Sequence, residues 1–202
     1  MEKIKKNSEV SIKLKTMQNR CSWVTDSKLY QDYHDFEWGI PVYDDKTLFE
    51  FLILETFQAG VSWITILNKR ENFRKAFDDF NYHKIANYKE IKFNELMQNP
   101  GIIRNKLKIK SAITNAQLFI EIQQEFGSFS KFIWSYVNGK PIINQFQNKD
   151  EVPATSGISD MISRDLKKRG FKFTGSTIMY AYMQAVGMVN DHTADCFKYK
   201  IL

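Results

Sequence analysis

The segment "TLFEFLILETFQ" (47–58) limits the fold of this chain more than any other. Its apolar residues recur at the spacing of a helix, and so few polar residues interrupt them that we expect the helix to be buried. Glu55 lies inside this segment, and Gly60 and Trp63 follow soon after it. A buried carboxylate is costly unless something compensates for its lost hydration. The rest of the sequence has to explain why Glu55 is there.

Most other patterns in the chain are also helical, and Asp44 or Asp45 is a suitable N-cap for the segment just described. No alternating strand pattern of useful length is present, so the predicted fold class is all-α. Residues 138–157 hold two of the four prolines, and we expect an irregular surface loop between two lobes there. Further helices are predicted at 61–67, 69–80, 105–126 (ended by Gly127), 128–137 (capped by Ser128), 159–171 and 175–189.

The length of 202 residues suggests one domain or two closely packed lobes. We expect residues 1–16 to be a basic, disordered lead and residues 17–202 to be a single domain of two packed helical lobes. No apolar run approaches the roughly 20 residues that span a membrane. The N-terminus also lacks the long apolar centre of a signal peptide. These features favour a cytoplasmic protein without a membrane partner.

The formal net charge of +6 is concentrated at the start of the chain. The first twenty residues hold six basic and two acidic residues, so the remaining body is only mildly basic. Such a balance is compatible with a polyanionic partner. An ordinary solvated surface explains it equally well.

Both cysteines and two of the three histidines lie near the ends of the predicted domain. Cys21 and His34 are 13 positions apart, whereas His192 and Cys196 are four apart and can share one helix face. Two such pairs would make a tetrahedral site, which is structural because no ligand position stays open. Spacing alone favours ordinary packing of these side chains. A metal would, however, join both ends of the folded body and add folding free energy.

The segment "LKKRGFKFTGSTIMYAYMQA" (166–185) combines a basic helix end, a turn with Gly170 and Gly175, and an apolar helix. Glycines let a main chain approach phosphate closely, and the second helix presents free N–H groups at its start. Lys172 and the basic residues 167–169 add positive charge. A plain connection between two helices with a basic rim is an equally good explanation.

A second basic stretch (99–113) surrounds the start of the helix predicted at 105–126. Its basic residues are Arg104, Lys106, Lys108 and Lys110. Here a solvated charged helix face is the favoured interpretation.

Five long blocks carry a family resemblance: "RCSWVTDSKLYQDYHDFEWGIPVYDD" (20–45), "LETFQAGVSWITILNKRENFRKAF" (54–77), "GIIRNKLKIKSAITNA" (101–116), "FIWSYVNGKP" (132–141) and "LKKRGFKFTGSTIMYAYMQAVGMVNDH" (166–192). From about residue 20 to its end, the chain resembles the DNA-3-methyladenine glycosylase I family. The resemblance implies a helix–hairpin–helix DNA glycosylase fold with one structural Zn²⁺ per chain. The implied zinc ligands are Cys21, His34, His192 and Cys196. The resemblance also implies that "RGFKFTG" grips the DNA backbone, through Gly170, Lys172 and Gly175.

The resemblance places a base-binding pocket at Glu55. The implied pocket residues around it are Tyr30, Tyr33 and Trp63, with Trp23 and Trp38 nearby. The loop "QAGV" (Gln58, Ala59, Gly60 and Val61) resembles the family segment that fills the space left by a flipped nucleotide. Val61 stands where a leucine is often found, and Thr56 and Phe57 replace more polar residues. These departures leave the fine selectivity open.

The implied activity is that of a monomeric, monofunctional DNA glycosylase of base excision repair. It would flip 3-methyladenine out of alkylated double-stranded DNA, hydrolyse the N-glycosidic bond and release the free base. Glu55 and Tyr33 are the predicted catalytic residues. Glu55 would accept hydrogen bonds from the base edge, while Tyr33 and Trp63 stack on its face. No lysine is required for a Schiff base, and Asp191 is not assigned a catalytic role.

Other interpretations remain open at this stage. Without the resemblance, an exposed Glu55 beside aromatic core residues would be favoured. A non-catalytic helical DNA-binding module is one alternative function. A glycosylase that prefers other N3-alkylated purines is another.

Overall fold

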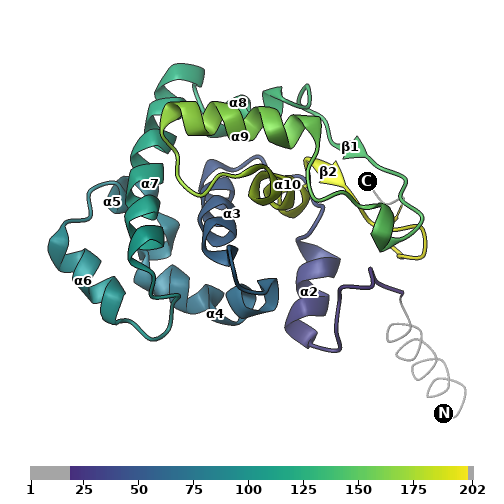
Figure 1. Cartoon of the computed structure of the whole chain (residues 1–202), viewed down its shortest axis with the longest axis horizontal. Coiled ribbons are helices and arrows are strands. Elements are labelled where there is room, and N and C mark those ends of the chain that lie inside the picture. Colours follow the sequence, from purple (N-terminus) through teal and green to yellow (C-terminus); the bar gives the residue numbers. More distant parts are fainter. Residues whose placement is uncertain (1–18, 200–202) are drawn as a thin grey trace, which may run out of the picture.

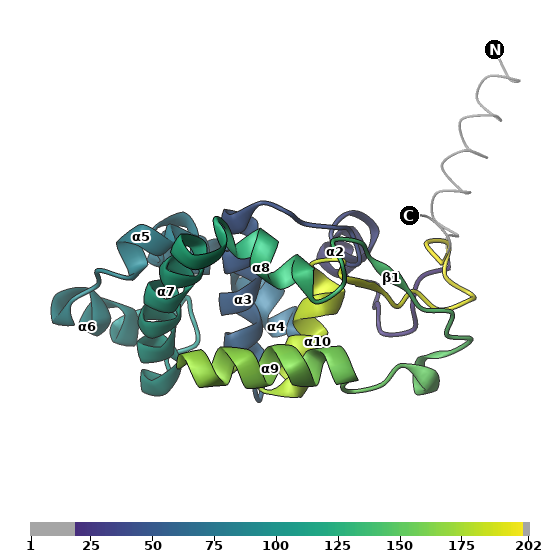
Figure 2. The same cartoon turned by 90° about the horizontal axis from the view of Figure 1, so that it is seen from above.

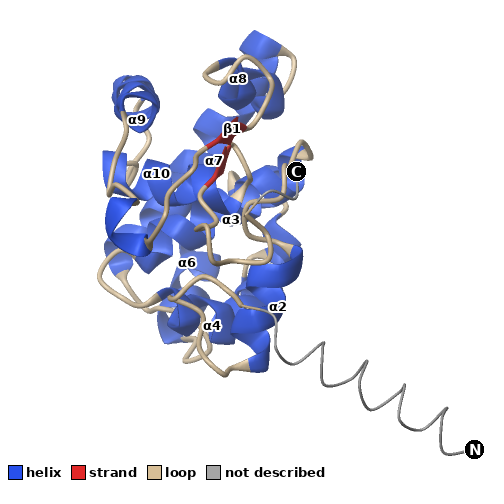
Figure 3. Ribbon diagram, turned by 90° about the vertical axis from the view of Figure 1, so that its right-hand side faces the viewer, coloured by secondary structure: helices blue, strands red, loops and turns tan. Residues whose placement is uncertain are grey.

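Helices make up almost all the regular structure in the computed structural model, which describes residues 19–199 (Figure 3). The predicted all-α class is confirmed, and the predicted lead at 1–16 lies outside the described residues. The elements in chain order are α2 (Lys28–Phe36), α3 (Asp45–Gln58), α4 (Trp63–Ala76), η1 (Asp78–Phe80), α5 (Tyr82–Ile85), α6 (Glu90–Gln98), α7 (Lys106–Phe126), α8 (Phe129–Ser135), β1 (Ile142–Ile143), η2 (Lys149–Glu151), α9 (Gly157–Arg169), α10 (Ser176–Ala185) and β2 (Val189–Asn190). None of the helices between residues 19 and 199 combines the length and apolar character needed to cross a bilayer.

The molecule is elongated in two perpendicular views, and its helices, which point in different directions, are distributed along the long axis (Figures 1 and 2). Helices α5, α6 and α7 lie at one end, and α2 lies at the other end with β1. Between them, α3 packs against α4, α7, α8 and α10. The division into two lobes that the sequence suggested stays a prediction.

Helix α3 is the buried centre of the molecule. Its apolar residues from Leu48 to Leu54 and Phe57 are at most 2% exposed. The Asp44 carboxylate caps the helix by accepting from the backbone N–H of Thr47 at 2.8 Å, as one of the two predicted caps. Because neighbours cover every face of α3, any polar side chain in its interior must also be buried.

The two helices predicted at 61–67 and 69–80 are wrong, because the structure has one continuous helix α4 there. No glycine or proline separates the two segments, so the backbone hydrogen bonds continue through Asn68. The predicted break after α3 is confirmed. Gly60 has a φ of 83° and begins the bend that leads into α4.

Helices α7 and α8 lie where they were predicted and have the predicted cap residues Gly127 and Ser128, although α8 ends at Ser135, two residues early. Asn105 caps α7 through the backbone N–H groups of residues 107 and 108, and Gly127 ends it in the left-handed conformation. Ser128 caps α8 by accepting from the backbone N–H of Lys131. The Asp45 carboxylate at the start of α3 also accepts from two N–H groups in the first turn of α8, at 2.7 and 2.9 Å. This second cap fixes α8 to the central helix.

The predicted pair of helices around 170–175 is present as α9 and α10, which pack against each other, but α10 ends at Ala185 and not at residue 189 as predicted. Gly170 ends α9 with a φ of 104°. The buried Asn115 of α7 holds the turn: its side chain accepts from the Lys172 N–H at 2.9 Å and donates to the Lys172 carbonyl at 3.0 Å. At Gly175 an added Cβ would meet nothing within 4 Å among residues 19–199 apart from the two chain neighbours, so the space beside the turn is open.

The two ends of the described chain are held together. β1, from the segment predicted to be irregular, pairs in parallel with β2, with Ile142 beside Val189. The segment after α2 lies against the end of α10, where the Val42 N–H donates to the Val186 carbonyl at 3.0 Å. Gly187 has a φ of 69°, and an added Cβ there would lie 2.3 Å from the carbonyl carbon of Ile40. Only glycine permits this close approach, which fixes α2 against the C-terminal region.

Candidate active site and metal centre

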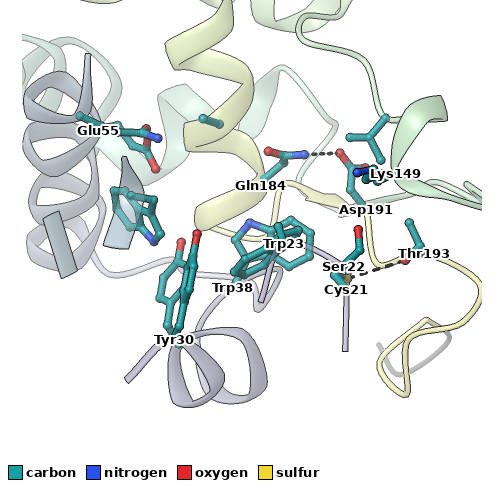
Figure 4. Close-up of a pocket in the computed structure, with 15 residues that line it drawn as sticks. Cys21, Ser22, Trp23, Tyr30, Trp38, Glu55, Lys149, Gln184, Asp191 and Thr193 are labelled. Atoms are coloured by element: carbon teal, nitrogen blue, oxygen red, sulfur yellow. Dashed lines mark hydrogen bonds between the residues drawn. The ribbon is translucent and has the colours of Figure 1, made fainter. Parts of the chain in front are cut away.

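A cavity of about 310 Å³ lies between α2, α3, α4 and the C-terminal part of the chain (Figure 4). Its size is within the usual range for sites that hold a small molecule, roughly 300–1,000 Å³. All six residues predicted to contact a base line it: Glu55, Tyr30, Tyr33, Trp63, Trp23 and Trp38. They come from three helices and two loops, so only the folded chain brings them together.

Glu55 lies in the last turn of α3 and is only 3% exposed. Its Oε2 is buried and has no hydrogen-bond partner among the described residues. Burial raises the pKa of Glu55 to about 8, because the charged form loses its hydration. The interpretation of Glu55 as an exposed helix residue is therefore wrong. Its carboxyl group is largely protonated at neutral pH in the protein alone.

Aromatic rings line the same cavity as this carboxyl group. The ring centroids of Tyr33 and Trp63 are 5.3 Å apart. The ring centroid of Trp23 is 5.0 Å from that of Tyr30 and 5.0 Å from that of Trp38. The indole Nε1 of Trp63 is the second buried polar atom here without a partner in the described chain. Buried polar groups are normally hydrogen-bonded. Two unpaired polar atoms beside flat rings therefore point to a flat ligand with its own donors and acceptors.

Arg70 of α4 connects the helices that form these walls. It is 8% exposed, and its Nε donates to Glu50 of α3 at 2.6 Å. Its Nη1 donates to Glu37, directly after α2, also at 2.6 Å. One side chain thus ties together α2, α3 and α4, and charge-assisted bonds of this kind fix geometry well.

The far wall of the cavity contains residues that the sequence did not predict for binding. Asp191 accepts from the Tyr180 hydroxyl at 2.7 Å, and from Gln184 at 2.8 Å (Figure 4). Ala181 and Gln184 follow the helical spacing of α10, which could have suggested a shared face. Lys149 comes from the irregular segment, which carries no pattern that could have indicated it. The unpredicted lining residues are Ser22, Lys149, Val152, Ala181, Gln184, Asp191 and Thr193.

The structure brings the four predicted metal ligands into one buried cluster. The ligand atoms of Cys21, His34, His192 and Cys196 all lie within 4.8 Å of one another. The Cys196 sulfur is 3.3 Å from His34 Nε2 and 3.4 Å from His192 Nδ1, and the Cys21 sulfur is also 3.4 Å from His192 Nδ1. Such a cluster of two thiols and two imidazoles could hold a metal ion.

Groups outside the cluster orient its ligands. Asp35 accepts from His34 Nδ1 at 2.8 Å, which leaves His34 Nε2 facing the sulfur atoms. Arg20 in turn donates two hydrogen bonds to Asp35, at 2.7 and 2.8 Å. A carboxylate behind a histidine is a common arrangement around metal ions. On the other side, the Trp38 ring packs edge-on against His192 at 4.6 Å, so the cluster supports the cavity wall directly.

Of the residues predicted to contact DNA, only Gln58 also lines the cavity. Ala59, Gly60 and Val61 form the bend that follows it, and Gly60 is exposed. The solvated-face interpretation of 99–113 holds for Arg104, Lys106 and Lys110, which are exposed. It is wrong for Lys108, which is 5% exposed because its ammonium group donates to the carbonyls of Phe57 and Ala59.

Comparison with known proteins agrees with this geometry. The family model described as methyladenine glycosylase matches residues 23–199. The chain belongs to this family. DNA-3-methyladenine glycosylase 1 of Escherichia coli (strain K12) is 47% identical over 180 residues, which cover 89% of this chain and 96% of that protein.

Solved structures of methyladenine glycosylases share the fold. A 3-methyladenine DNA glycosylase I from Staphylococcus aureus has a TM-score of 0.87 at 39% identity, with 90% of this chain and 97% of that chain covered. A second solved structure, of a 3-methyladenine DNA glycosylase I variant in complex with 3-methyladenine, has a TM-score of 0.86 at 39% identity, with 90% of this chain and 97% of that chain covered.

The departures from the family pattern at Thr56 and Phe57 lie in the core of this methyladenine glycosylase. Both residues are fully buried. The Thr56 hydroxyl donates to the Leu52 carbonyl at 2.8 Å, and the Phe57 ring packs 4.9 Å from that of Phe73. Neither residue lines the cavity. Of the departures noted in the sequence, only Val61 lies on the exposed bend.

The pKa of Glu55 predicts how Glu55→Gln changes the stability of this methyladenine glycosylase. The folded-state pKa of about 8 exceeds the ordinary value of 4.5, so the protonated carboxyl stabilises the fold at low pH. This contribution is complete below about pH 4.5 and is lost as the pH rises through 8. Glutamine does not titrate. The difference in free energy of unfolding, variant minus wild type, should therefore increase as the pH is raised from about 4.5 to about 9. We expect this increase to be on the order of 4 kcal/mol at most. Urea unfolding of both proteins measures it, and parallel pH profiles would contradict the burial of this group.

Proposed function

We propose that this chain is a monofunctional DNA glycosylase that excises 3-methyladenine from alkylated double-stranded DNA, as the first step of base excision repair. The observation that carries the proposal is the buried, unpartnered Glu55 carboxyl that faces a cavity walled by Tyr33 and Trp63. A relative with the same fold, solved in complex with 3-methyladenine, supports this choice of base.

The recessed position of the cavity requires that the base leave the duplex. A stacked base cannot reach a carboxyl that is 3% exposed, so the nucleotide must flip out. In this proposal the bend at residues 58–61 fills the space that the nucleotide leaves. The turn at residues 170–175 holds the DNA backbone. These roles follow from the family resemblance, and each turn presents one exposed residue, Gly60 in the first and Lys172 in the second.

Charge selects the alkylated base in this mechanism. Methylation at N3 makes the nucleoside cationic, and a cation next to Glu55 lowers the pKa of its carboxyl group. Glu55 then ionises and accepts hydrogen bonds from the base edge. Tyr33 and Trp63 stack on the base and favour a cation by about 0.5–2 kcal/mol. Neutral adenine gives no such compensation for burying a charged carboxylate.

Cleavage needs little help from acids, because the leaving base already carries the charge. The bond between the sugar C1′ and the base nitrogen breaks, and its electron pair neutralises the base as it departs. A water molecule adds to C1′ and gives up a proton, leaving an abasic sugar. Positioning by Glu55 and Tyr33 is therefore the main contribution of the protein. Lys149, the only lysine lining the cavity in the described part of the chain, is an exposed residue, and we expect no strand cleavage.

The proposed grip on DNA predicts the effect of Lys172→Met. Lys172 is exposed on the turn that Asn115 holds in place. If its ammonium group contacts a phosphate, the variant binds duplex DNA more weakly, and the slope of log K against log salt falls by about 1. Fluorescence anisotropy over a salt series measures this slope. Lys46→Met, at the opposite end of α3 from the bend, is the matched control and should keep the wild-type slope. An unchanged slope in Lys172→Met would exclude the phosphate contact.

We further propose that the cysteine–histidine cluster holds one structural Zn²⁺ per chain. With Zn–S near 2.3 Å and Zn–N near 2.1 Å, tetrahedral geometry separates sulfur from nitrogen by about 3.6 Å. The observed separations of 3.3–3.4 Å fit this requirement. All four positions are taken by side chains, so the metal would supply structural stability and no step of the reaction. Because the cysteines must stay reduced, we place the protein in the cytoplasm. We expect a monomer that uses its exposed turns to bind DNA.

Chromatography of the bases released from methylated duplex DNA tests the function. We expect free 3-methyladenine, with the DNA strand left uncut at the abasic site. Release of a different N3-alkylated purine would indicate a shifted preference. Binding to the duplex without release of any base would leave a DNA-binding module and exclude the enzyme.

A further inference from the structure

Lys108 is a buried lysine whose ammonium group bonds, within residues 19–199, only to backbone carbonyls. It lies in the first turn of α7, and it is 5% exposed. Its Nζ donates to the carbonyl of Phe57 at 2.8 Å and to that of Ala59 at 2.5 Å. Burial lowers the pKa of Lys108, because the ammonium loses hydration. A lysine in such a position is costly, so its contacts require a reason.

The two carbonyls belong to a tight turn that follows α3. The Val61 N–H donates to the Gln58 carbonyl at 2.7 Å, which closes a four-residue turn. Ala59 has φ −48° and ψ 113°, and Gly60 has φ 83°. These angles define a type II turn, which favours glycine at its third position. At Gly60 no described atom beyond its two chain neighbours lies within 4 Å of an added Cβ, so the tip of the turn projects into open space.

The ammonium group joins the helix to the turn. Phe57 is the second-last residue of α3, and Ala59 is the first residue past its end. A cation is favoured at the C-terminal end of a helix, where carbonyls lack partners. Lys108 comes from a helix 49 and 51 positions further along the chain, so it fixes the turn relative to the body of the protein. Its two bonds add to the turn's own bond from Val61 to Gln58 and to the packing of Val61 against the core.

We propose that Lys108 is a positioning residue that pre-shapes the turn Gln58–Val61 for insertion into the DNA. This inference rests on the proposed role of that turn in filling the gap left by a flipped nucleotide. A loop that is already ordered loses less conformational entropy when it binds. Lys108 therefore supports the steps that involve the duplex, whereas binding of the free base depends on residues that Lys108 does not contact.

The test compares Lys108→Met with Lys108→Arg and with the control Lys106→Met. Methionine keeps the length of the side chain but cannot donate, and arginine can still donate to two carbonyls. Lys106 is an exposed lysine in the same helix turn, so the control removes the same charge. Three quantities are measured for each protein. They are the single-turnover rate of 3-methyladenine release, the affinity for free 3-methyladenine, and the preference for a duplex with a tetrahydrofuran abasic-site analogue over an intact duplex.

For Lys108→Met we expect about 30-fold slower release and about a tenfold weaker preference for the abasic-site duplex. Its affinity for free 3-methyladenine should stay within about threefold of wild type. Lys108→Arg should recover most of both losses, and Lys106→Met should stay within about threefold throughout. Wild-type release and preference in Lys108→Met would overturn the inference. A loss of affinity for free 3-methyladenine as large as the loss of abasic-site preference would also overturn the inference. Such a result would show that Lys108 has a general structural role.

A second variant covers the case in which Lys108→Met does not fold. Gly60→Ala disturbs the same turn from its exposed tip, where alanine disfavours the positive φ but meets no neighbour. We expect it to lower release and the abasic-site preference while keeping free-base affinity. If Gly60→Ala shows the wild-type release rate and the wild-type abasic-site preference, the shape of the turn has no role in these steps. The abasic-site preference does not depend on catalysis. If wild type prefers the abasic-site duplex but releases no base, the proposed function fails and the role of Lys108 is still tested.

Discussion

Replacing Glu55 with glutamine is expected to lower the rate of 3-methyladenine release by about 100-fold or more. The carboxylate forms charge-assisted hydrogen bonds with the cationic base, each worth about 1.5–3 kcal/mol. Glutamine has nearly the same shape but carries no charge. A loss of about 2.7 kcal/mol in the transition state corresponds to this 100-fold change. Single-turnover release from methylated duplex DNA measures it, with enzyme in excess.

The control for this prediction is Glu121→Gln on the exposed side of α7, which makes the same chemical change away from the cavity. It should keep the wild-type rate. Because Glu55→Gln removes a buried ionisable group, its fold should be at least as stable as wild type above pH 8. A well-folded Glu55→Gln protein with near-normal turnover would remove Glu55 from the mechanism.

Among the proposed substitutions, Cys196→Ser is expected to cause the largest loss of folding stability. The Cys196 sulfur lies within 3.4 Å of both cluster histidines, and a bound metal would connect it to Cys21 as well. Metal binding free energy is folding free energy, so losing one of four ligands should cost about 4 kcal/mol or more. For a domain of this length that corresponds to a fall in Tm of about 10 °C. Thermal unfolding together with zinc analysis of the purified protein measures both effects.

The neighbouring exposed Asp195 provides a matched control, because Asp195→Asn leaves all four ligands in place. It should keep the metal and stay within a few degrees of the wild-type Tm. Since Trp38 packs on His192, Cys196→Ser should also weaken binding of free 3-methyladenine. A purified wild-type protein that holds no metal, and that chelators leave equally stable, would disprove the metal site.

Some of this structure can be predicted from the sequence, because local patterns decide it. The apolar period of α3 and the caps at Asp44, Gly127 and Ser128 need no knowledge of distant residues. The grouping of the four ligands could be predicted only with the family resemblance, because spacing alone favoured ordinary packing. The cavity residues were likewise indicated by the family resemblance. The distances between them, however, are known only from the folded structure.

Other features depend on contacts that no local pattern encodes. Lys108 lies in a basic stretch that favours a solvated face, and only the carbonyls at the end of α3 explain its burial. The far wall of the cavity includes Lys149 from an irregular segment and Asp191 beside the cluster. The predicted break within α4 failed for a simpler reason, because a polar residue such as Asn68 does not end a helix by itself.

The cysteine–histidine cluster has a consequence for the synthesis of the chain. Its first half, Cys21 and His34, leaves the ribosome long before His192 and Cys196. At about 5–20 residues per second, the interval between His34 and His192 lasts roughly 8–30 s. During that time Cys21 and His34 lack the other two members of the cluster, and α2 with Tyr33 is not fixed against the C-terminal region. A polypeptide that stops short of residue 192 thus has an incomplete pocket, and only the finished chain can close around a damaged base.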